Sequence, residues 1–133
     1  GPDMPEAFRM NVSIGRFLPR DDPTAPRAFA VLGSKMRQEL FGERNPLGQR
    51  ITIGGSRYRI IGVMESKGTV LGFDLDDTVY IPAASAMSLF NRDTLFQIDF
   101  NKFSRPGIKI GLDGRGRRSQ QRQAMILLCP DDR

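Results

Sequence analysis

The residues best suited to chemistry are three aspartates in one short turn, Asp74, Asp76 and Asp77, within the run GFDLDD. Carboxylates bind hard cations, but a calcium-binding loop needs about twelve residues with oxygen ligands at set positions. This run has neither that length nor that pattern. A small hydrolase that uses the carboxylates of residues 74–77 is a second hypothesis. A polar turn before a strand explains the run more simply, so we expect no metal site.

Other candidate chemistry is sparse. The chain has no histidine and a single cysteine, Cys129, so it lacks the commonest general base and zinc ligand and cannot form an internal disulfide. With no histidine to activate it, Cys129 is interpreted as an incidental thiol. Gly33-Ser34-Lys35 has the wrong order for a phosphate-binding loop, which needs GxxxxGK followed by Ser or Thr. We therefore predict a protein that is not an enzyme and binds no cofactor.

The net charge of +5 is concentrated at one end of the chain. Residues 1–101 carry 12 Lys/Arg and 12 Asp/Glu, whereas residues 102–133 carry 8 and 3. A soluble basic module that binds nucleic acid through this Arg-rich tail is therefore the alternative function. The tail is rich in Gly, Arg and Gln, and no aromatic residue follows Phe103 to stack on a base. A solvated or disordered tail is the simpler interpretation, and we expect no nucleic-acid partner.

Apolar patterning predicts strands and helices in mixed order within one domain, which is the number expected for 133 residues. Residues 28–32 are short, apolar and bounded by glycine, as in a buried strand. Residues 34–41 predict a helix that starts at a serine cap and is ended by the following glycine. Residues 78–81 predict a strand, residues 82–90 a helix that starts at a proline, and residues 94–100 a half-buried strand.

The strongest folding signal is a β-hairpin over residues 51–60. Gly54 and Gly55 form its two-residue turn, because glycine reaches positive φ without a steric penalty. This turn pairs residue 53 with residue 56 and residue 51 with residue 58. The alternation then places four side chains on one buried face: Ile51, Ile53, Tyr58 and Ile60. The predicted fold class is α+β, a small mixed sheet with a central β-hairpin and two helices.

Two details of this hairpin stand out. Arg50 and Arg59 become neighbours on the solvent side, where we expect their repulsion to be relieved by Glu65 or by a partner. The apolar alternation breaks at Ile60-Ile61, which predicts a bulge or burial on both faces beside Gly62.

Several blocks in consistent order carry a resemblance to a known family. They read GRFLPRDD, then AVLGSKMRQELFGERNPLGQRITIGGSRYRIIGVMESKG, then GFDLDDTVYIPAASAMSLF. Together they resemble the MacB-like periplasmic core domain of ABC transporter permeases, of the MacB/FtsX-like family, over about residues 12–100. The most specific part is the order LFG, NPLGQ, strand, Gly-Gly turn, strand and IGV.

This resemblance implies a function that the residues alone do not indicate. In the family, the domain lies outside the cytoplasmic membrane between the first two transmembrane helices of the permease, and a separate cytoplasmic ATPase supplies energy. It has no catalytic site, transmits the ATP-driven conformational change, and contacts cargo or, in some members, a periplasmic adaptor protein. The resemblance thus implies the periplasmic domain of an inner-membrane protein.

The resemblance divides the chain into three segments. Residues 1–11 are interpreted as an irregular segment or a remnant of protease cleavage, since the chain opens with Gly-Pro. Residues 12–101 resemble mainly the distal lobe of the family domain. Residues 102–133 depart from the family pattern, and we expect a basic tail that is disordered or foreign to the family.

The loop of residues 67–77 is the predicted partner contact. It is long and Gly-rich, and it presents Leu71 and Phe73 beside Asp74 among polar residues. The alternative is that this loop folds onto the protein's own core.

Overall fold

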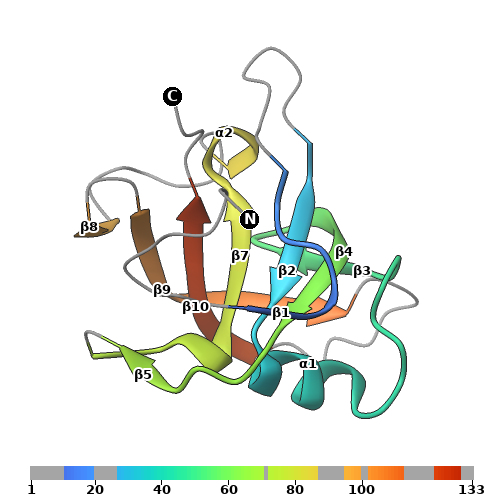
Figure 1. Cartoon of the computed structure of the whole chain (residues 1–133). Coiled ribbons are helices and arrows are strands. Elements are labelled where there is room, and N and C mark those ends of the chain that lie inside the picture. Colours follow the sequence, from blue (N-terminus) through green and yellow to red (C-terminus); the bar gives the residue numbers. More distant parts are fainter. Residues whose placement is uncertain are drawn as a thin grey trace.

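The computed structural model describes residues 11–19, 27–70, 72–86, 95–99, 102–112 and 122–129 (Figure 1). Within them the fold is mixed α+β and consists mostly of strands. The main sheet contains β1 (Val12–Gly15), β2 (Phe29–Leu32), β3 (Arg50–Ile53), β4 (Ser56–Met64), β7 (Thr78–Pro82), β8 (Phe96–Asp99), β9 (Lys102–Leu112) and β10 (Arg122–Cys129). The other elements are helices α1 (Ser34–Phe41) and α2 (Ala83–Ala86), the short strands β5 (Thr69–Val70) and β6 (Phe73–Asp74), and the 3-10 turn η1 (Leu75–Asp77).

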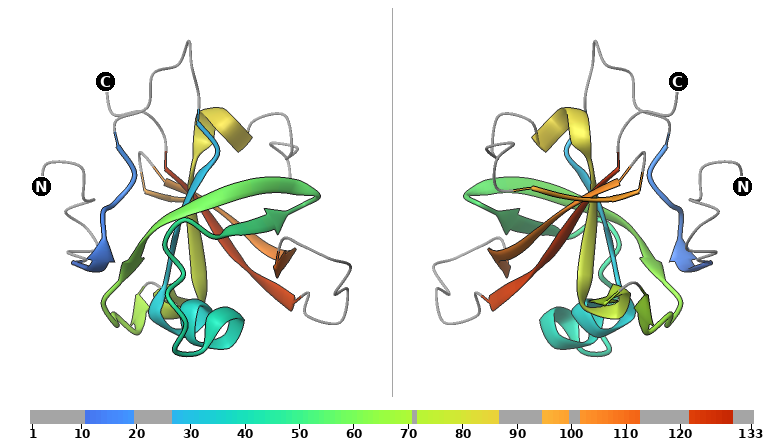
Figure 2. Two further views of the ribbon diagram at one scale, coloured as in Figure 1. Left: turned by 90° about the vertical axis from the view of Figure 1, so that its right-hand side faces the viewer. Right: turned by 90° about the vertical axis from the view of Figure 1, so that its left-hand side faces the viewer.

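The main sheet closes on itself. Strands β4, β2, β7, β10, β9 and β3 follow one another, and β3 then pairs with β4 again. The β2–β4 and β7–β10 pairs are parallel, whereas the other neighbours around the ring are antiparallel. Both side views in Figure 2 show the strands crossing one another around a common centre, as in a small barrel. Closure gives backbone partners to strand edges that would otherwise be exposed.

The β3–β4 hairpin has the register that the sequence predicts, with Ile51 opposite Tyr58 and Ile53 opposite Ser56. Gly54 and Gly55 form the turn with φ of 57° and 87°, values that favour glycine. The four predicted inner side chains are at most 1% exposed and belong to the larger core cluster. The expectation of a small sheet centred on this hairpin is corrected, because the hairpin is one part of the wall of a closed sheet.

The break in alternation at Ile60 and Ile61 corresponds to a bulge. The β2–β4 register runs from Ile60 directly to Gly62 and leaves Ile61 unpaired. Gly62 is needed here because β1 and the residues after it cross β4 so closely that a Cβ on Gly62 would overlap the backbone of Arg16. The bulge and the glycine therefore let β1 pair along the second half of β4.

The expectation of a disordered tail is wrong for the described parts of residues 102–133. These parts form β9 and β10, and β10 lies between β7 and β9. Ile126, Leu127 and Leu128 are at most 1% exposed. A short apolar run with a neighbour on each edge is the pattern of a strand buried on both faces, so this end of the chain completes the barrel.

The second predicted helix is described only in its first part, and it begins one residue later than expected. Pro82 is the last residue of β7, and within the described residues α2 covers Ala83–Ala86. The remainder of the predicted helix, residues 87–90, lies outside the described residues. The predicted strand over residues 94–100 is present as β8, which pairs with β9.

Two apolar clusters lie on opposite sides of the sheet. The larger cluster fills the interior and includes Met36, Leu40 and Phe41 from α1 and Ala86 from α2. The smaller cluster covers the outer side of β2, β7 and β10, where Val31, Tyr80 and Leu127 pack with Leu18, Met64 and Leu75. Phe17 contacts Tyr80 edge to face, with ring centroids 6.0 Å apart. The segment after β1 and the β5–β6 region therefore form a second layer on one side of the barrel.

Candidate partner-contact site at the β5–β6 hairpin

The predicted contact loop forms a small hairpin separate from the main sheet. Thr69 pairs with Asp74 and Val70 with Phe73, and Gly72 has a φ of 82° in the turn. In Figure 1 this hairpin projects from the lower left of the molecule, away from β3. Phe73 is half-buried and packs against the outer cluster, whereas Asp74 is exposed. Leu71 lies outside the described residues. The base of the hairpin therefore packs on the core through Phe73, and whether Asp74 contacts a partner stays a prediction.

Asp76 anchors this hairpin. Its carboxylate accepts hydrogen bonds from the Ser66 hydroxyl at 2.7 Å, the Lys67 N–H at 2.5 Å and the Gly68 N–H at 3.1 Å. Partial burial acts to raise the pKa of Asp76, but these donors and the Ser34 side chain outweigh it, so the pKa lies below its ordinary value. The ionised carboxylate therefore fixes the segment between β4 and β5 against η1.

The η1 turn is held from both of its ends. The Asp74 carboxylate accepts from the Asp76 N–H at 3.0 Å and caps the turn, and the Thr78 hydroxyl donates to the Asp74 carbonyl at 2.8 Å. The Tyr80 hydroxyl donates to the Leu75 carbonyl at 2.9 Å. Burial raises the pKa of Tyr80, so its hydroxyl stays protonated and remains a donor.

Gly33 brings the start of α1 against this turn. Its N–H donates to the Thr78 carbonyl at 2.8 Å, and a Cβ on Gly33 would overlap the backbone oxygens of Leu75 and Asp76. Only glycine lets the β2–α1 connection approach η1 so closely. The close approach places Ser34 within reach of the Asp76 carboxylate.

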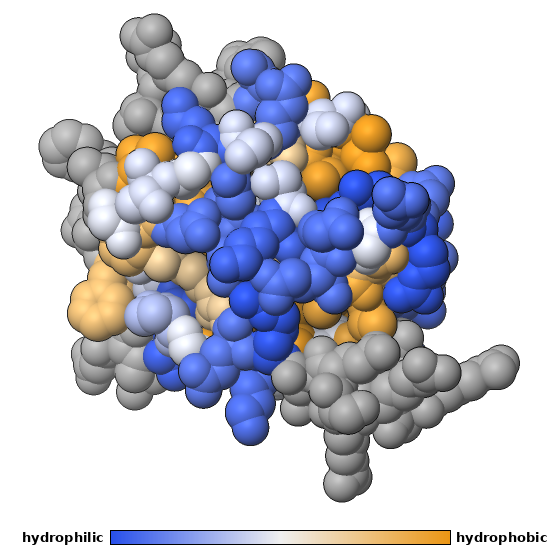
Figure 3. Space-filling model, turned by 90° about the horizontal axis from the view of Figure 1, so that it is seen from below, coloured by the Kyte–Doolittle hydropathy of each residue, from blue (hydrophilic) through white to orange (hydrophobic). Residues whose placement is uncertain are grey.

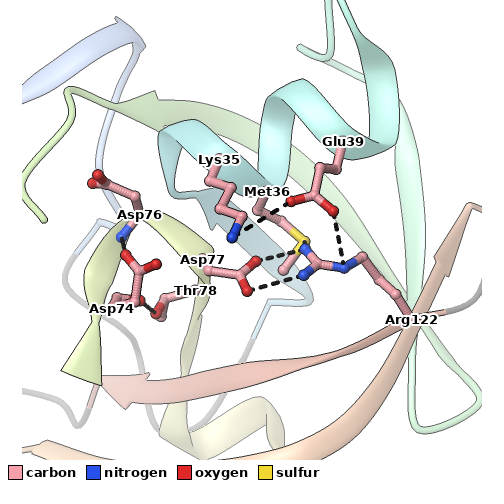
Figure 4. A network of polar contacts seen from close by, with 8 residues as sticks. All are labelled: Lys35, Met36, Glu39, Asp74, Asp76, Asp77, Thr78 and Arg122. Atoms are coloured by element: carbon pink, nitrogen blue, oxygen red, sulfur yellow. Dashed lines mark hydrogen bonds and ion pairs between the residues drawn. The ribbon is translucent and has the colours of Figure 1, made fainter. Parts of the chain in front are cut away.

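We call η1, the start of α1 and the segment between β4 and β5 the η1 corner. Asp77 links this corner to β10 (Figure 4). Arg122 donates to both of its carboxylate oxygens, Nη1 to Oδ1 at 2.5 Å and Nη2 to Oδ2 at 2.9 Å. The guanidinium also lies 3.6 Å from Glu39 on α1 and 3.4 Å from the sulfur of Met36. Hydrogen bonding to Asp77 raises the pKa of Arg122, so this side chain is a permanent cationic link between β10, η1 and α1.

These contacts show what the three aspartates do. Each carboxylate is engaged by backbone N–H groups, hydroxyls or Arg122, and the pKa of Asp76 is lowered, whereas a general acid needs a raised pKa. Within the described ranges no group of three His, Cys, Asp or Glu residues is arranged to hold a metal ion. The three carboxylates therefore have a structural role: they hold the η1 corner together at the base of the β5–β6 hairpin.

Sequence reasoning missed part of this corner. The cap formed by Asp74 was readable, because aspartate two residues before a turn N–H is a common Asx arrangement. The role of Arg122 could not be predicted from the sequence, because Arg122 lies 45 residues from Asp77 in a segment interpreted as a solvated tail.

The surface around this corner is mixed in character. Seen from below in Figure 3, hydrophilic side chains cover the centre of the end that carries α1, and hydrophobic side chains show toward both the left and the right of this view. None of the helices in the described ranges is long and apolar enough to cross a membrane.

Comparison with known proteins identifies the family. The sequence pattern of the MacB-like periplasmic core domain matches residues 1–111, further at both ends than residues 12–100. The macrolide export ATP-binding/permease proteins MacB of Bdellovibrio bacteriovorus and Chlorobium luteolum are each 36% identical to the chain, over 96 and 97 residues. The pyoverdine export ATP-binding/permease protein PvdT of Pseudomonas aeruginosa is 37% identical over 90 residues.

These alignments cover 71%, 72% and 66% of this chain but only 15%, 15% and 14% of the three relatives. The chain therefore corresponds to a small part of each relative. No solved structure shows significant similarity to it. Because the family pattern extends over most of its length, the chain belongs to the family of MacB-like periplasmic core domains.

Proposed function

We propose that this chain is the extracytoplasmic domain of an ABC transporter permease, where it transmits ATP-driven conformational change without catalysing a reaction. The observation that carries the proposal is the family match over residues 1–111, together with relatives named as export ATP-binding/permease proteins. On this proposal the domain lies in the periplasm, attached to the transmembrane helices of its permease in the inner membrane. A cytoplasmic ATPase subunit or domain supplies the energy.

The architecture supports a role in transmitting force. A closed sheet with an apolar interior and a second apolar layer resists local deformation, because moving one strand disturbs packing on both of its faces. The Arg122–Asp77 pair and the Asp76 contacts add polar links between β10, η1, α1 and the β4–β5 segment. A body of this kind moves as a unit when the elements attached to it move.

The β5–β6 hairpin is the proposed contact for cargo or for a periplasmic adaptor, through Leu71, Phe73 and Asp74. It projects from the barrel and is anchored at its base, so a partner that binds it also pulls on the η1 corner. The nucleic-acid alternative is less well supported, because Arg122 of the basic tail binds Asp77 and Glu39.

The location is tested in the parent transporter in intact cells. Cys129 is first replaced by Ser, and a cysteine is then introduced in place of the exposed Asp74. A membrane-impermeant maleimide should label Asp74→Cys in cells whose outer membrane has been made permeable and whose inner membrane is intact. Labelling that appears only after the inner membrane is disrupted would overturn the periplasmic assignment.

The contact is tested by photo-crosslinking in the same parent protein. A photoreactive amino acid is placed at exposed Thr69 on the hairpin and, as the matched control, at exposed Gln38 on α1. We expect crosslinks to an adaptor or cargo from residue 69 and none from residue 38. Equal crosslinking from both positions, or none from residue 69 while transport continues, would contradict the hairpin contact.

A further inference from the structure

The outer face of the β3–β4 hairpin carries a pair of like charges that no acidic side chain of the described residues neutralises. Arg50 and Arg59 are directly opposite in the antiparallel register, and both are exposed. Directly opposite side chains have Cβ atoms about 4.5–5.5 Å apart, and like charges at such positions destabilise a sheet. Neither arginine forms an ion pair with Glu65 or with any other residue in the described ranges. The expected relief by Glu65 is therefore missing.

More cations extend this face across neighbouring strands. Arg57 is exposed on β4 opposite Thr52, and Lys109 is exposed on β9 beside the turn, where its carbonyl accepts from the Gly54 N–H at 3.3 Å. Arg16 lies over the ring of Phe29, 5.6 Å from its centroid, and Phe29 is the β2 residue paired with Arg59. The basic face is thus formed by Arg16, Arg50, Arg57, Arg59 and Lys109.

The three strands that carry most of this face contain no acidic residue. The sequences of β3, β4 and β9 are RITI, SRYRIIGVM and KFSRPGIKIGL. The acidic corner, by contrast, lies at η1 and α1, where its carboxylates are used in internal contacts. The left view in Figure 2 looks onto β3 and β4, and in Figure 1 they lie on the other side of the molecule from β5.

We propose that the basic face docks against an acidic protein surface, whose Asp and Glu side chains bind Arg50 and Arg59. A carboxylate between two guanidinium groups turns their mutual repulsion into attraction, and guanidinium forks bind carboxylates in bidentate geometry. Electrostatic complementarity of this kind sets the orientation and speed of association more than its strength. This surface is distinct from the β5–β6 hairpin and does not depend on the role proposed there.

The observations favour a protein over an anionic membrane. Stable attachment to a lipid surface combines a cluster of about four to eight cations with apolar side chains that enter the headgroup region. The tip of this hairpin is Gly54-Gly55, and the large exposed hydrophobic residues in the described ranges, Ile14 and Phe96, lie on β1 and β8. A rigid, strand-spaced set of arginines without an apolar tip is better suited to carboxylates held at fixed positions.

The test compares two net-charge-matched variants of the whole chain. Arg50→Gln/Arg59→Gln removes the opposed pair, and Lys35→Gln/Lys67→Gln removes two exposed charges elsewhere. Binding is measured at low and physiological salt to a fluorescein-labelled ten-residue Glu-rich peptide, and in parallel to vesicles containing phosphatidylglycerol. Melting temperature is measured for each variant.

We expect the unmodified chain to bind the peptide in a salt-sensitive manner. Arg50→Gln/Arg59→Gln should weaken binding about fivefold or more, whereas the control should weaken it by less than about twofold. The melting temperature of Arg50→Gln/Arg59→Gln should stay the same or rise, because repulsion is removed. Equal weakening by both variants would show a general charge effect and overturn the proposal. If the unmodified chain bound vesicles more strongly than the peptide, and Arg50→Gln/Arg59→Gln abolished that binding, the partner would be a lipid surface and not a protein. A clear fall in the melting temperature of Arg50→Gln/Arg59→Gln would show that the two arginines stabilise the fold and would also overturn the proposal.

Discussion

The Arg122–Asp77 ion pair gives the sharpest test of how the end of the chain is placed. The pair joins β10 to η1 by two hydrogen bonds of 2.5 Å and 2.9 Å. The test is a double-mutant cycle in which Arg122→Gln and Asp77→Asn are made singly and together, since both changes remove charge and keep much of the shape. If residues 122–129 were a solvated tail, the two substitutions would act independently.

The expected magnitude follows from exposure and geometry. The two side chains are 25% and 22% exposed, between the fully exposed and fully buried cases. Exposed pairs contribute about 0.2–1 kcal/mol, whereas removal of one partner from a buried pair costs about 3–5 kcal/mol. We therefore expect each single substitution to lower the free energy of unfolding by about 2 kcal/mol, with a coupling energy of about 1–2 kcal/mol. Arg122→Gln should cost slightly more, because it also loses the contact with Glu39.

The assay is urea unfolding of the four proteins, followed by circular dichroism. The control cycle uses Lys35→Gln and Glu39→Gln, whose side chains are 52% and 41% exposed and 4.0 Å apart. Its coupling energy should be at most about 0.5 kcal/mol. A coupling energy between Arg122 and Asp77 below about 0.3 kcal/mol would refute the placement of β10 against η1.

Three further predictions concern other parts of the fold. Ile53→Asp should lower the free energy of unfolding by about 4 kcal/mol or more, because Ile53 is fully buried and the new carboxylate would have no partner. The control Ile53→Val should lower it by about 1 kcal/mol. An unchanged melting temperature for Ile53→Asp would show that Ile53 does not belong to the inner face. Asp76→Asn should cost about 1–2 kcal/mol at neutral pH and speed hydrogen exchange at the Lys67 and Gly68 amides. Because the fold lowers the pKa of Asp76, the stabilisation by this carboxylate is complete above the ordinary pKa of about 3.9 and is lost as pH falls through the lower folded pKa. The difference in stability between Asp76→Asn and the unmodified protein should therefore vanish in strong acid. A difference that persisted there would show that the ionised carboxylate is not its cause. Gly62→Ala should destabilise by about 2 kcal/mol or more through overlap with the Arg16 backbone, and calorimetry that finds no change would contradict the close crossing of β1 over β4.

Local patterns were sufficient where the signal lies within a few residues. The two-residue Gly54-Gly55 turn determines which residues of β3 and β4 are opposite, and period-two alternation determines which face is buried. Helix α1 covers the predicted residues 34–41, because the apolar spacing and Gly42 act within one or two turns. The predicted serine cap is wrong: the N-cap is Gly33 without a side-chain cap hydrogen bond, and the Ser34 side chain contacts Asp76 instead. The stretch of residues 67–77 was also singled out from composition, as Gly-rich with apolar residues, and its contact with a partner stays a prediction.

The rest was decided by contacts between residues distant in the sequence. Closure of the sheet depends on β3 pairing with β9, including a hydrogen bond from the Thr52 hydroxyl to the Gly111 carbonyl 59 residues away, and no local pattern specifies which of several compatible strands will pair. For the same reason the Arg-rich end was expected to be a solvated tail, although its Ala124–Cys129 run fits between β7 and β9. The sequence by itself determined the hairpin, the first helix and the family, because these depend on near neighbours and on the order of motifs. Only the tertiary structure determined the closed sheet, the Arg122–Asp77 link and the lack of a counter-charge for Arg50 and Arg59 among the described residues, because each depends on which distant side chains the completed barrel brings together.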